Sequence, residues 1–569
     1  MRPRTLISRL TSLTTTSVLQ PGFLETAPTY SYRDSRGERT VVKNSTSKTM
    51  MSSTEKICSV NDLTNSTILL TNHQKKGSWI EKPKRILKSV KCFFRETTVE
   101  PCLFIYMLCT SLSSMAVQNM HLEKSCRVHY DFGDDICDRI RDLNTTGLES
   151  ELSQVQTLVA KVMAWKFPLQ TAIPAVLVLF VGAWSDKYKR RKICILFPFI
   201  GEIVTNIGLL FATYYFKELS LQATALIEAL PAAFTGSYII IFMGMYSFMS
   251  DRTTIENRTF RLGIVTIFVS FGTPTGTALS GVLLRGLGYY GVFTLLLFLH
   301  MFSFLYGAVR LEDVAIEKNE VTLDNTSGNK CEKIFRDVFG LVGNTVLVAL
   351  RPRASDGRLQ IFLVIVLYLI MVGPLYGDSQ VSYLYARRKF QLNEVEYSIY
   401  GTANILLGLI GTVFCISVLS KKFQVQDSAI GGLAGVSRIA ACFVFAFASS
   451  RSWYYSAPVF NIFSHTGLTA VRSIATKSVP TEEVAKLSAL LGVTEALAPS
   501  IYMPASSYIY VSTIDILPGA FYLFDASLTV LALGFFAFIY ILVRKRQRSV
   551  VSVPEKKEEF ARTNEVSKF

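Results

Sequence analysis

Apolar residues occur along the chain in continuous runs that are separated by polar stretches. A run of about 20 apolar residues is long enough to cross about 30 Å of hydrocarbon as an α-helix. The runs do not alternate between apolar and polar positions, which argues against the strands of a membrane β-barrel. The pattern predicts an all-α membrane protein with twelve transmembrane helices, at residues 98–120, 167–186, 193–215, 223–249, 261–284, 291–309, 359–384, 395–419, 428–448, 456–476, 487–511 and 519–543.

One long polar stretch divides the predicted helices into two sets of six. The residues before the first helix are rich in Ser, Thr and Arg and contain no long apolar run, so we expect them to be largely disordered in the cytosol. A faint similarity to an organellar presequence is the alternative for this segment. The predicted domains are an N-terminal extension at 1–95, a six-helix bundle at 96–309, a cytosolic linker at 310–358, a second six-helix bundle at 359–543 and a cytosolic tail at 544–569.

The distribution of charged residues predicts how the helices are oriented across the membrane. Only 18% of the residues are charged and the net charge is +16. The cations lie mainly in short loops and tails, where they orient a membrane protein, so we predict no nucleic-acid partner. Residues 187–192 and 544–548 are basic and are expected inside, whereas residues 121–165 are mainly acidic and are expected outside. Both termini are then cytosolic, but Arg387, Arg388 and Lys389 fall on the outer side and contradict the pattern.

The large loop at 121–165 contains two features that suit the outer side of a membrane. Asn144-Thr-Thr matches the acceptor sequence for N-glycosylation. Cys126 and Cys137 are the only cysteines in an outer loop, and we expect a disulfide in that oxidising environment, with two free thiols as the alternative. The five cysteines inside apolar runs are predicted to be inert packing residues: Cys102, Cys109, Cys194, Cys415 and Cys442.

The loop after the second helix, Gly182-Ala-Trp-Ser-Asp186-Lys-Tyr-Lys-Arg190-Arg191, resembles a loop motif of the major facilitator superfamily. A glycine at a helix end permits close approach of a neighbouring helix. The aspartate can face the positive end of that neighbour's dipole. Lys189 stands where the family usually has a second glycine, which raises the question of how the loop turns.

A second stretch resembles the proton-coupled folate transporter family, solute carrier family 46, in a divergent or insect-type form. It is Ser250-Asp251-Arg-Thr-Thr-Ile-Glu-Asn-Arg-Thr-Phe-Arg261, after helix four. Further similarity lies at 98–101, 230–236 and 287–293. The resemblance implies the major facilitator fold, in which two pseudo-symmetric halves rock about a central site. It also implies a cytosolic gate of Gly182, Asp186, Arg190, Asp251 and Arg261 that locks the outward-facing state; charges that merely solvate the membrane surface are the alternative.

Placing an ionisable side chain inside a membrane helix costs free energy, so each such residue in a predicted helix suggests a function. An arginine offers a fork to substrate carboxylates, and Arg472 matches a substrate-binding position of the resembling family. We assign Arg472 to anion binding and Glu495 to its partner in the empty site; a permanent pair that braces two helices is the alternative. Arg438 and Asp525 are a second predicted brace.

Proton coupling requires a carboxyl group in a low-dielectric environment, and Glu202 and Glu495 are the predicted groups. Two positions differ from the folate carrier: Thr266 replaces a coupling glutamate, and the region around Leu375 contains no histidine. These differences argue against folate itself. Tyr376, Asp378 and Tyr383 lie on the outer part of helix seven and are predicted to form an outer gate, with Tyr376 and Asp378 also assigned to substrate binding. Core packing or a place at the membrane interface is the alternative for the tyrosines.

These residues favour a secondary active transporter that carries a folate-like or muropeptide- or conjugate-like organic anion with protons across a lipid bilayer. A transporter-like receptor or scaffold without net transport is the second hypothesis. We predict no enzyme activity, cofactor or metal, because the chain has no phosphate loop, catalytic carboxylate pair or metal-spaced His/Cys set. The plasma membrane is the expected location, with the lysosomal membrane as the alternative, and the sequence leaves the oligomeric state open.

Overall fold

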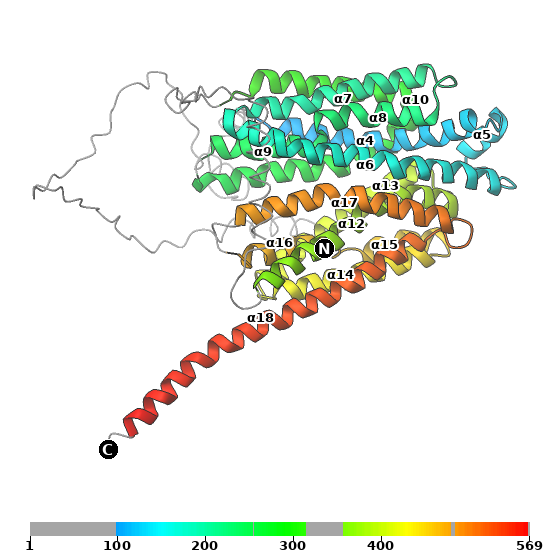
Figure 1. Ribbon diagram of the computed structural model, residues 1–569. Coiled ribbons are helices and arrows are strands. Elements are labelled where there is room, and N and C mark those ends of the chain that lie inside the picture. Colours follow the sequence, from blue (N-terminus) through cyan, green and yellow to red (C-terminus); the bar gives the residue numbers. More distant parts are fainter. Residues whose placement is uncertain (1–97, 254, 314–356, 480–483, 567–569) are drawn as a thin grey trace, which may run out of the picture. The chain divides into compact units, whose positions relative to one another are not determined.

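The computed structural model describes residues 98–253, 255–313, 357–479 and 484–566 (Figure 1). From Val99 onward these residues belong to one compact unit. The predicted N-terminal extension and most of the predicted linker lie outside the described residues, so the proposed domain boundaries stay predictions.

The first half of the fold is built from helices α4 to α10. A π-helical segment, Ser125–His129, continues α4, and the short helix α5 lies outside the bundle. The bounds are α4 Glu100–Lys124, α5 Asp134–Arg141, α6 Glu149–Tyr188, α7 Arg191–Tyr214, α8 Leu221–Thr235, α9 Ser237–Arg252 and α10 Ile255–Arg310.

The second half is built from helices α12 to α18. A π-helical segment, Cys415–Ser420, continues α13. The bounds are α12 Gly357–Phe390, α13 Glu394–Phe414, α14 Asp427–Phe447, α15 Arg451–Phe460, α16 Thr466–Lys477, α17 Val484–Thr513 and α18 Ala520–Val566.

The described helices account for twelve membrane passes. Nine stretches of the described chain are long and apolar enough to span a bilayer. One of them, Arg261–Arg310, has 50 residues and holds two passes, because Gly288 has φ of 62° and breaks α10. The α15–α16 pair and the 30-residue α17 supply the remaining two. The predicted fold class, a twelve-helix membrane protein in two halves, is confirmed.

One predicted helix boundary is wrong, and one helix continues beyond a predicted membrane span that agrees with the apolar span Ala520–Arg544. Helix α6 begins at Glu149, well before residue 167, because its extension buries an apolar stripe at helical spacing made of Leu152, Val155, Val159 and Met163. Charged residues on the other faces of this extension had suggested a loop. Helix α18 continues through Val566, so most of the expected tail at 544–569 is helical.

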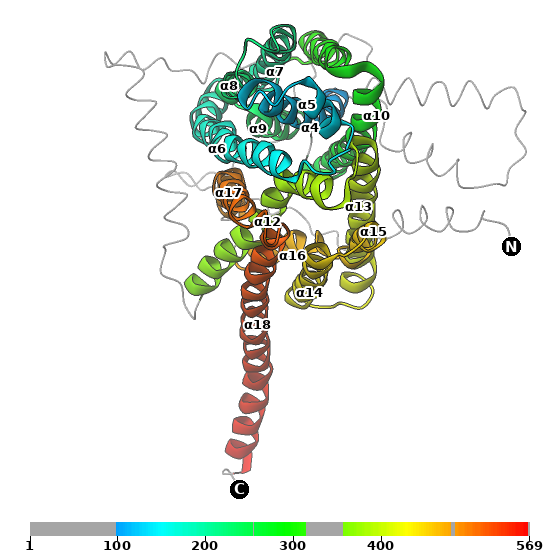
Figure 2. The ribbon, with the colours of Figure 1, turned by 90° about the vertical axis from the view of Figure 1, so that its right-hand side faces the viewer.

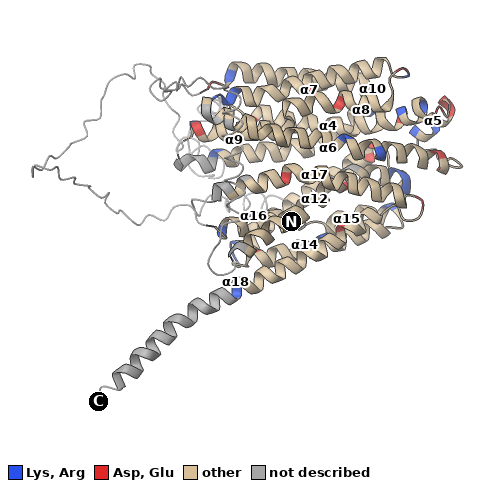
Figure 3. Ribbon diagram, viewed as in Figure 1, with Lys and Arg blue, Asp and Glu red and all other residues tan. Residues whose placement is uncertain are grey.

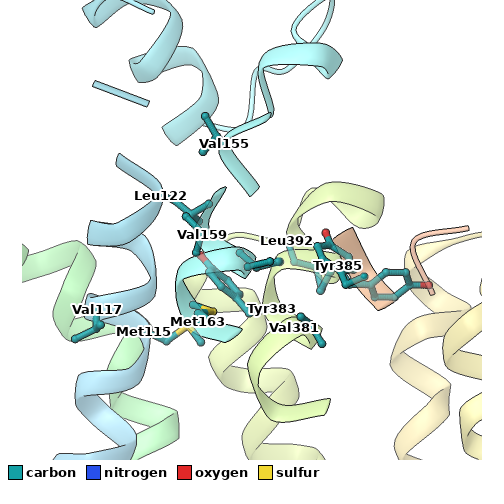
Figure 4. Close-up of a cluster of buried hydrophobic side chains, with 14 of the residues drawn as sticks. Met115, Val117, Leu122, Val155, Val159, Met163, Val381, Tyr383, Tyr385 and Leu392 are labelled. Carbon is teal, nitrogen blue, oxygen red and sulfur yellow. The ribbon is translucent and has the colours of Figure 1, made fainter. Parts of the chain in front are cut away.

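The buried apolar residues show how the halves meet. We call the side of the bundle next to α5 the α5 end. There, one cluster joins Met115, Val155 and Val159 of the first half to Tyr383 and Leu392 of the second (Figure 4). Viewed from this end, α6 lies beside α17 and α10 beside α13 (Figure 2).

Away from the α5 end, the buried apolar residues of the described chain form separate clusters within each half: a large one in each, and a small one of Cys415, Ile430 and Ala470 in the second half. The first packs residues 99–106 against residues 241–249. The second packs residues 361–372 against residues 471–491 and 532–539. Among the described residues, the two halves therefore share a core only at the α5 end.

Candidate functional site

Most charged residues of the described chain lie near the helix ends, and the few that lie along the helices within the bundle mark candidate sites (Figure 3). Arg472 of α16 is one of these. Its Nη2 donates to Glu495 Oε2 of α17 over 2.6 Å. Arg472 also donates to the hydroxyl of Tyr368 on α12, from Nη2 over 2.6 Å and from Nε over 3.0 Å. Tyr368 in turn donates to Glu495 Oε2 over 2.8 Å. Three helices of the second half thus converge on one carboxylate.

The Arg472–Glu495 pair is partly exposed at the protein surface. The Arg472 side chain is 56% exposed and that of Glu495 is 31% exposed, whereas Tyr368 is fully buried. An ion pair this accessible adds little to stability, so a brace is a poor explanation for it. Tyr238 and Tyr246 of α9 lie within electrostatic range of Glu495, and the pair therefore faces the first half.

Tyr376 and Asp378 do not lie in the same place. Tyr376 is within electrostatic range of both Tyr238 and Glu495, as its assignment to the substrate site requires. Asp378 instead forms an ion pair with Arg438 of α14. Arg438 also lies 3.5 Å from Asp525 of α18. The structure thus removes Asp378 from the Arg472 site and places it in a buried triad, because its side chain projects toward α14 and α18.

Glu202 lies in the first half, on α7. The hydroxyl of Tyr106 on α4 donates to its carboxylate over 3.0 Å, and the same hydroxyl is 3.4 Å from Ser237 at the start of α9. Ser237 directly precedes Tyr238, so this group sits next to the tyrosines that face Glu495. The two predicted proton-coupling carboxyl groups, Glu202 and Glu495, thus lie on either side of the interface between the halves.

The predicted gate at the opposite end is centred on a different arginine. Arg191, not Arg190, donates to Asp251 over 3.0 Å and to Ser185 over 2.8 Å. Arg190 is exposed. Lys189 adopts φ of 50°, the left-handed conformation that glycine favours, so the loop turns here and directs Arg191 inward. The side chain of Asp186 lies outside the described residues.

Two further predicted gate residues, Arg261 and Gly182, also belong to the first half. Arg261 forms an ion pair of 3.4 Å with Glu100 at the start of α4, inside the first half. A side chain at Gly182 would meet nothing within 4 Å, so the expected close approach of a neighbouring helix at this glycine is wrong. The close approach occurs at Gly244, where a Cβ would lie 2.9 Å from Cys194.

The α5 end is held by Arg387, which joins the halves. It donates to the side-chain oxygen of Asn119 over 3.1 Å and to the Tyr383 hydroxyl over 3.0 Å. It also donates to the carbonyls of Ile140 and Arg141 in α5, over 3.1 and 3.0 Å. Tyr383 donates to Asn119 as well, over 2.9 Å, which supports its predicted place at a gate between the halves.

The neighbouring cations also have fixed partners. Arg388 pairs with Asp515 over 2.9 Å. Lys389 donates to the Tyr385 hydroxyl and to the Ala446 carbonyl, each over 3.1 Å. These cations are used as hydrogen-bond donors, which explains why they lie at an end where a charge count does not expect them.

Hydrogen bonds between α10 and α13 add to this closure. Ser398 lies 2.9 Å from Ser280 and accepts a bond from the Gly281 N–H over 3.0 Å. A Cβ at Gly281 would lie 2.2 Å from the Glu394 carbonyl oxygen, so only glycine allows the helices to meet this closely. Gln156 also joins the halves, through the Leu384 carbonyl and the Tyr510 hydroxyl.

A disulfide links Cys126 to Cys137 and ties α5 to the end of α4. Arg127 pairs with Asp134 and Asp138 across the same loop. Arg127 holds the pKa of the Asp134 carboxyl below its usual range, so this exposed pair is lost only as the pH falls through that lowered value. Asn144 follows α5 and is exposed, as a glycosylation acceptor must be.

One charged cluster was missed by the sequence analysis. Lys166 of α6 donates to both oxygens of Glu228 on α8, over 2.7 and 2.8 Å, and His121 of α4 lies 3.4 Å from the same carboxylate. Lys166 and His121 had been assigned to a loop, because the helices were predicted too short. Glu228 stood inside the predicted fourth helix and could have been identified there.

The family model of the Major Facilitator Superfamily matches residues 101–464, more than half of the chain. The chain belongs to the major facilitator superfamily. It is an integral, multi-pass membrane protein and a transporter.

Curated relatives of this transporter include two members of solute carrier family 46. A "probable peptidoglycan muropeptide transporter SLC46" of Drosophila melanogaster is 23% identical over 76% of this chain and 83% of the relative. A "lysosomal proton-coupled steroid conjugate and bile acid symporter SLC46A3" of Gallus gallus is 22% identical over 80% of this chain and 97% of the relative. The predicted resemblance to this family is confirmed.

Solved structures show the same major facilitator fold. The POT family transporter PepTSo aligns with a TM-score of 0.51 at 12% identity, over 79% of this chain and 98% of that chain. The human organic anion transporter MFSD10 aligns with a TM-score of 0.50 at 12% identity, over 77% of this chain and 98% of that chain.

Among the described residues of the transporter, no group of three His, Cys, Asp or Glu side chains could hold a metal ion.

Proposed function

We propose that this transporter carries an organic anion in symport with protons, and that Arg472, Tyr368 and Glu495 form its anion site. The observation that carries the proposal is the accessible Arg472–Glu495 pair, which faces the other half of the molecule. A guanidinium group presents paired donors that match a carboxylate or sulfonate. Glu495 accepts a hydrogen bond from one nitrogen of that group, Nη2, so a substrate anion has to replace it there.

Protonation of Glu495 provides the coupling step. A neutral carboxyl group no longer competes for Arg472, which becomes free to bind the substrate anion, while Tyr368 keeps the arginine in position. Loss of the proton restores the pair and expels the anion. Glu202 is the second proton-binding group that we propose, on the first half of the molecule and in contact with Tyr106.

The arrangement of the halves suits alternating access. They share a core and the Arg387 hydrogen bonds at the α5 end, whereas their cores are separate at the opposite end. We assign the α5 end, with its disulfide and Asn144, to the outer or luminal side, and the opposite end to the cytosol. The structure then represents an inward-facing state, and Arg191–Asp251 and Arg261–Glu100 belong to the predicted cytosolic gate.

The site favours a bulky anion. Four tyrosines surround or face the charged pair: Tyr238, Tyr246, Tyr368 and Tyr376. Aromatic walls add apolar contact area around a charged group. Muropeptides and steroid conjugates are the compounds that the names of the two relatives give as their substrates. Both combine an anionic group with a large scaffold. Folate fits less well, because the hydroxyl of Thr266 bonds to its own helix at the Leu262 carbonyl and supplies no carboxyl group.

Uptake into cells tests the proposal. Cells that express the chain at the plasma membrane are given a labelled muropeptide and a labelled steroid conjugate at acidic and at neutral external pH. We expect saturable uptake of at least one probe that is faster at acidic pH and is lost in Arg472→Ala. Arg285→Ala is the control, because Arg285 is exposed and lies away from this site. Equal uptake by wild type and Arg472→Ala contradicts the site; binding without uptake indicates a receptor.

A further inference from the structure

A buried triad in the second half carries unbalanced charge. Arg438 of α14 forms ion pairs with two carboxyl groups, those of Asp378 on α12 and Asp525 on α18. The Arg438 side chain is 7% exposed, that of Asp378 is 13% exposed and that of Asp525 is fully buried. With every group ionised, one positive charge faces two negative charges.

The carboxyl groups lack other donors. Neither oxygen of Asp525 accepts a hydrogen bond from another described group, and the same is true of Asp378 Oδ1. The two carboxyl groups are also held close together, because both lie against the same atom, Arg438 Nη2. Two carboxylates can hydrogen-bond to one another only when one of them carries a proton, and like charges held this close favour a shared proton.

The groups around the triad do not supply the missing positive charge. Among the described residues, the titratable side chains that face it are tyrosines, one cysteine and one histidine. His465 lies near Arg438, on the cation's side of the triad. The full set is Tyr397 and Tyr400 of α13, Cys442 of α14, His465 before α16, Tyr502 of α17 and Tyr522 of α18.

The other buried cluster provides a contrast. Lys166 and Glu228 form a balanced pair beside His121 in the first half. Such a pair needs no proton to become neutral. An unpaired charge in a low-dielectric interior costs several kcal/mol, and a buried carboxylate avoids this cost by binding a proton. The triad can reach neutrality only in that way.

We propose that Asp378 and Asp525 share one proton and that the Asp378–Arg438–Asp525 triad is a proton-binding site of the transport cycle. This site rests on the proposed proton-coupled function and is additional to Glu202 and Glu495. Tyr385, Tyr454 and Tyr522 form part of the aromatic core between the triad and the α5 end. The closed α5 end therefore seals the proton in, and opening of that end gives the triad access to the outer solution.

Infrared spectroscopy of the purified, full-length protein tests the site without any substrate. The C=O stretch of a protonated carboxyl group is recorded at neutral and at alkaline pH. We expect a protonated-carboxyl band at neutral pH that is lost in Asp525→Asn and in Asp378→Asn. Asp427→Asn is the matched control, because Asp427 pairs with Lys477 in a balanced pair outside the triad. Identical bands in wild type and both triad variants overturn the proposal.

A transport measurement tests the triad separately from the proposed function of the whole protein. In Asp525→Asn, we expect pH-driven uptake of the same two probes to fall at least tenfold, while exchange of probe across the membrane at equal pH is retained. Asparagine resembles the protonated acid, so the variant is expected to fold. Unchanged pH-driven uptake in this variant overturns the site and leaves the proposed function intact. If wild type moves neither probe, the proposed function fails, and the infrared result alone decides the triad.

Discussion

At Arg472, one guanidinium group is shared between a carboxylate and a phenol. In the mechanism that we propose, Glu495 is the group that a substrate displaces, and Tyr368 also accepts hydrogen bonds from the arginine. The sequence predicted the pair of charges, because both lie inside apolar runs. It did not predict Tyr368, because one tyrosine among 25 carries no pattern that marks it as a partner.

Arg472→Lys is predicted to bind the organic anion more weakly than wild type. A lysine keeps the charge but loses the fork, so one charge-assisted hydrogen bond is lost, at about 1.5–3 kcal/mol. That loss corresponds to a rise in Kd of roughly 10- to 150-fold. Equilibrium binding of the labelled probe to purified protein measures it, with Arg285→Lys as the control. Equal Kd values for Arg472→Lys and wild type contradict the role.

Tyr368→Phe is predicted to weaken proton coupling while the protein is still expressed at the cell surface. The variant keeps the buried ring and removes only the hydroxyl that both Arg472 and Glu495 contact. We expect uptake to depend less steeply on external pH, because Arg472 is held less firmly when Glu495 is protonated. The pH profile of uptake at constant surface expression checks this, and Tyr214→Phe, on an exposed residue of α7, is the control. An unaltered profile argues against the coupling step.

At the scale of the helix, sequence and structure agree on which segments cross the membrane and disagree on where they end. Hydropathy identifies the membrane-embedded part of a helix, but it does not detect the more polar part that extends into the aqueous solution. The extension of α6 was therefore read as a loop, and Lys166 with it. The cations Arg387 to Lys389 depart from the charge pattern for a related reason: a charge count cannot distinguish a solvated cation from one that donates hydrogen bonds to fixed partners.

Closure of the α5 end is predicted to depend on Gly281 of α10. In Gly281→Ala the new Cβ would lie 2.2 Å from the Glu394 carbonyl, so α10 and α13 have to separate. We expect the population with an open α5 end to grow, as measured by the distance between spin labels placed on the two helices. Gly286→Ala is the matched control on the same helix, since a Cβ there meets nothing within 4 Å. Indistinguishable distance distributions for both variants contradict this role.

At the scale of the whole molecule, the described parts of the two halves share a core at one end and have separate cores at the other. The twelve-helix, two-half fold could be predicted from apolar runs and one linker. The state of the transporter could not, because which end is closed depends on contacts between residues that are distant in sequence, such as Asn119 with Arg387 and Gly281 with Ser398.

Glycosylation tests the assigned direction. If the α5 end is extracytosolic, the Asn144 acceptor sequence is used, because Asn144 is exposed beside α5. Thr146→Ala removes the acceptor sequence, and we expect a glycosidase-sensitive shift on a gel to disappear. Thr145→Ala changes the middle position and is expected to keep the shift. Glycosidase-insensitive wild-type protein, with no shift in either variant, argues for the opposite orientation.

Proton-driven transport by this molecule is tested most directly with purified protein in lipid vesicles. A labelled steroid conjugate and a labelled muropeptide are supplied outside vesicles whose external solution is more acidic than the interior. We predict that at least one probe accumulates above its external concentration, that a protonophore abolishes the accumulation, and that vesicles with Arg472→Ala show none. Entry of a probe that stops at equal concentrations, whatever the pH gradient, would show that transport is not coupled to protons.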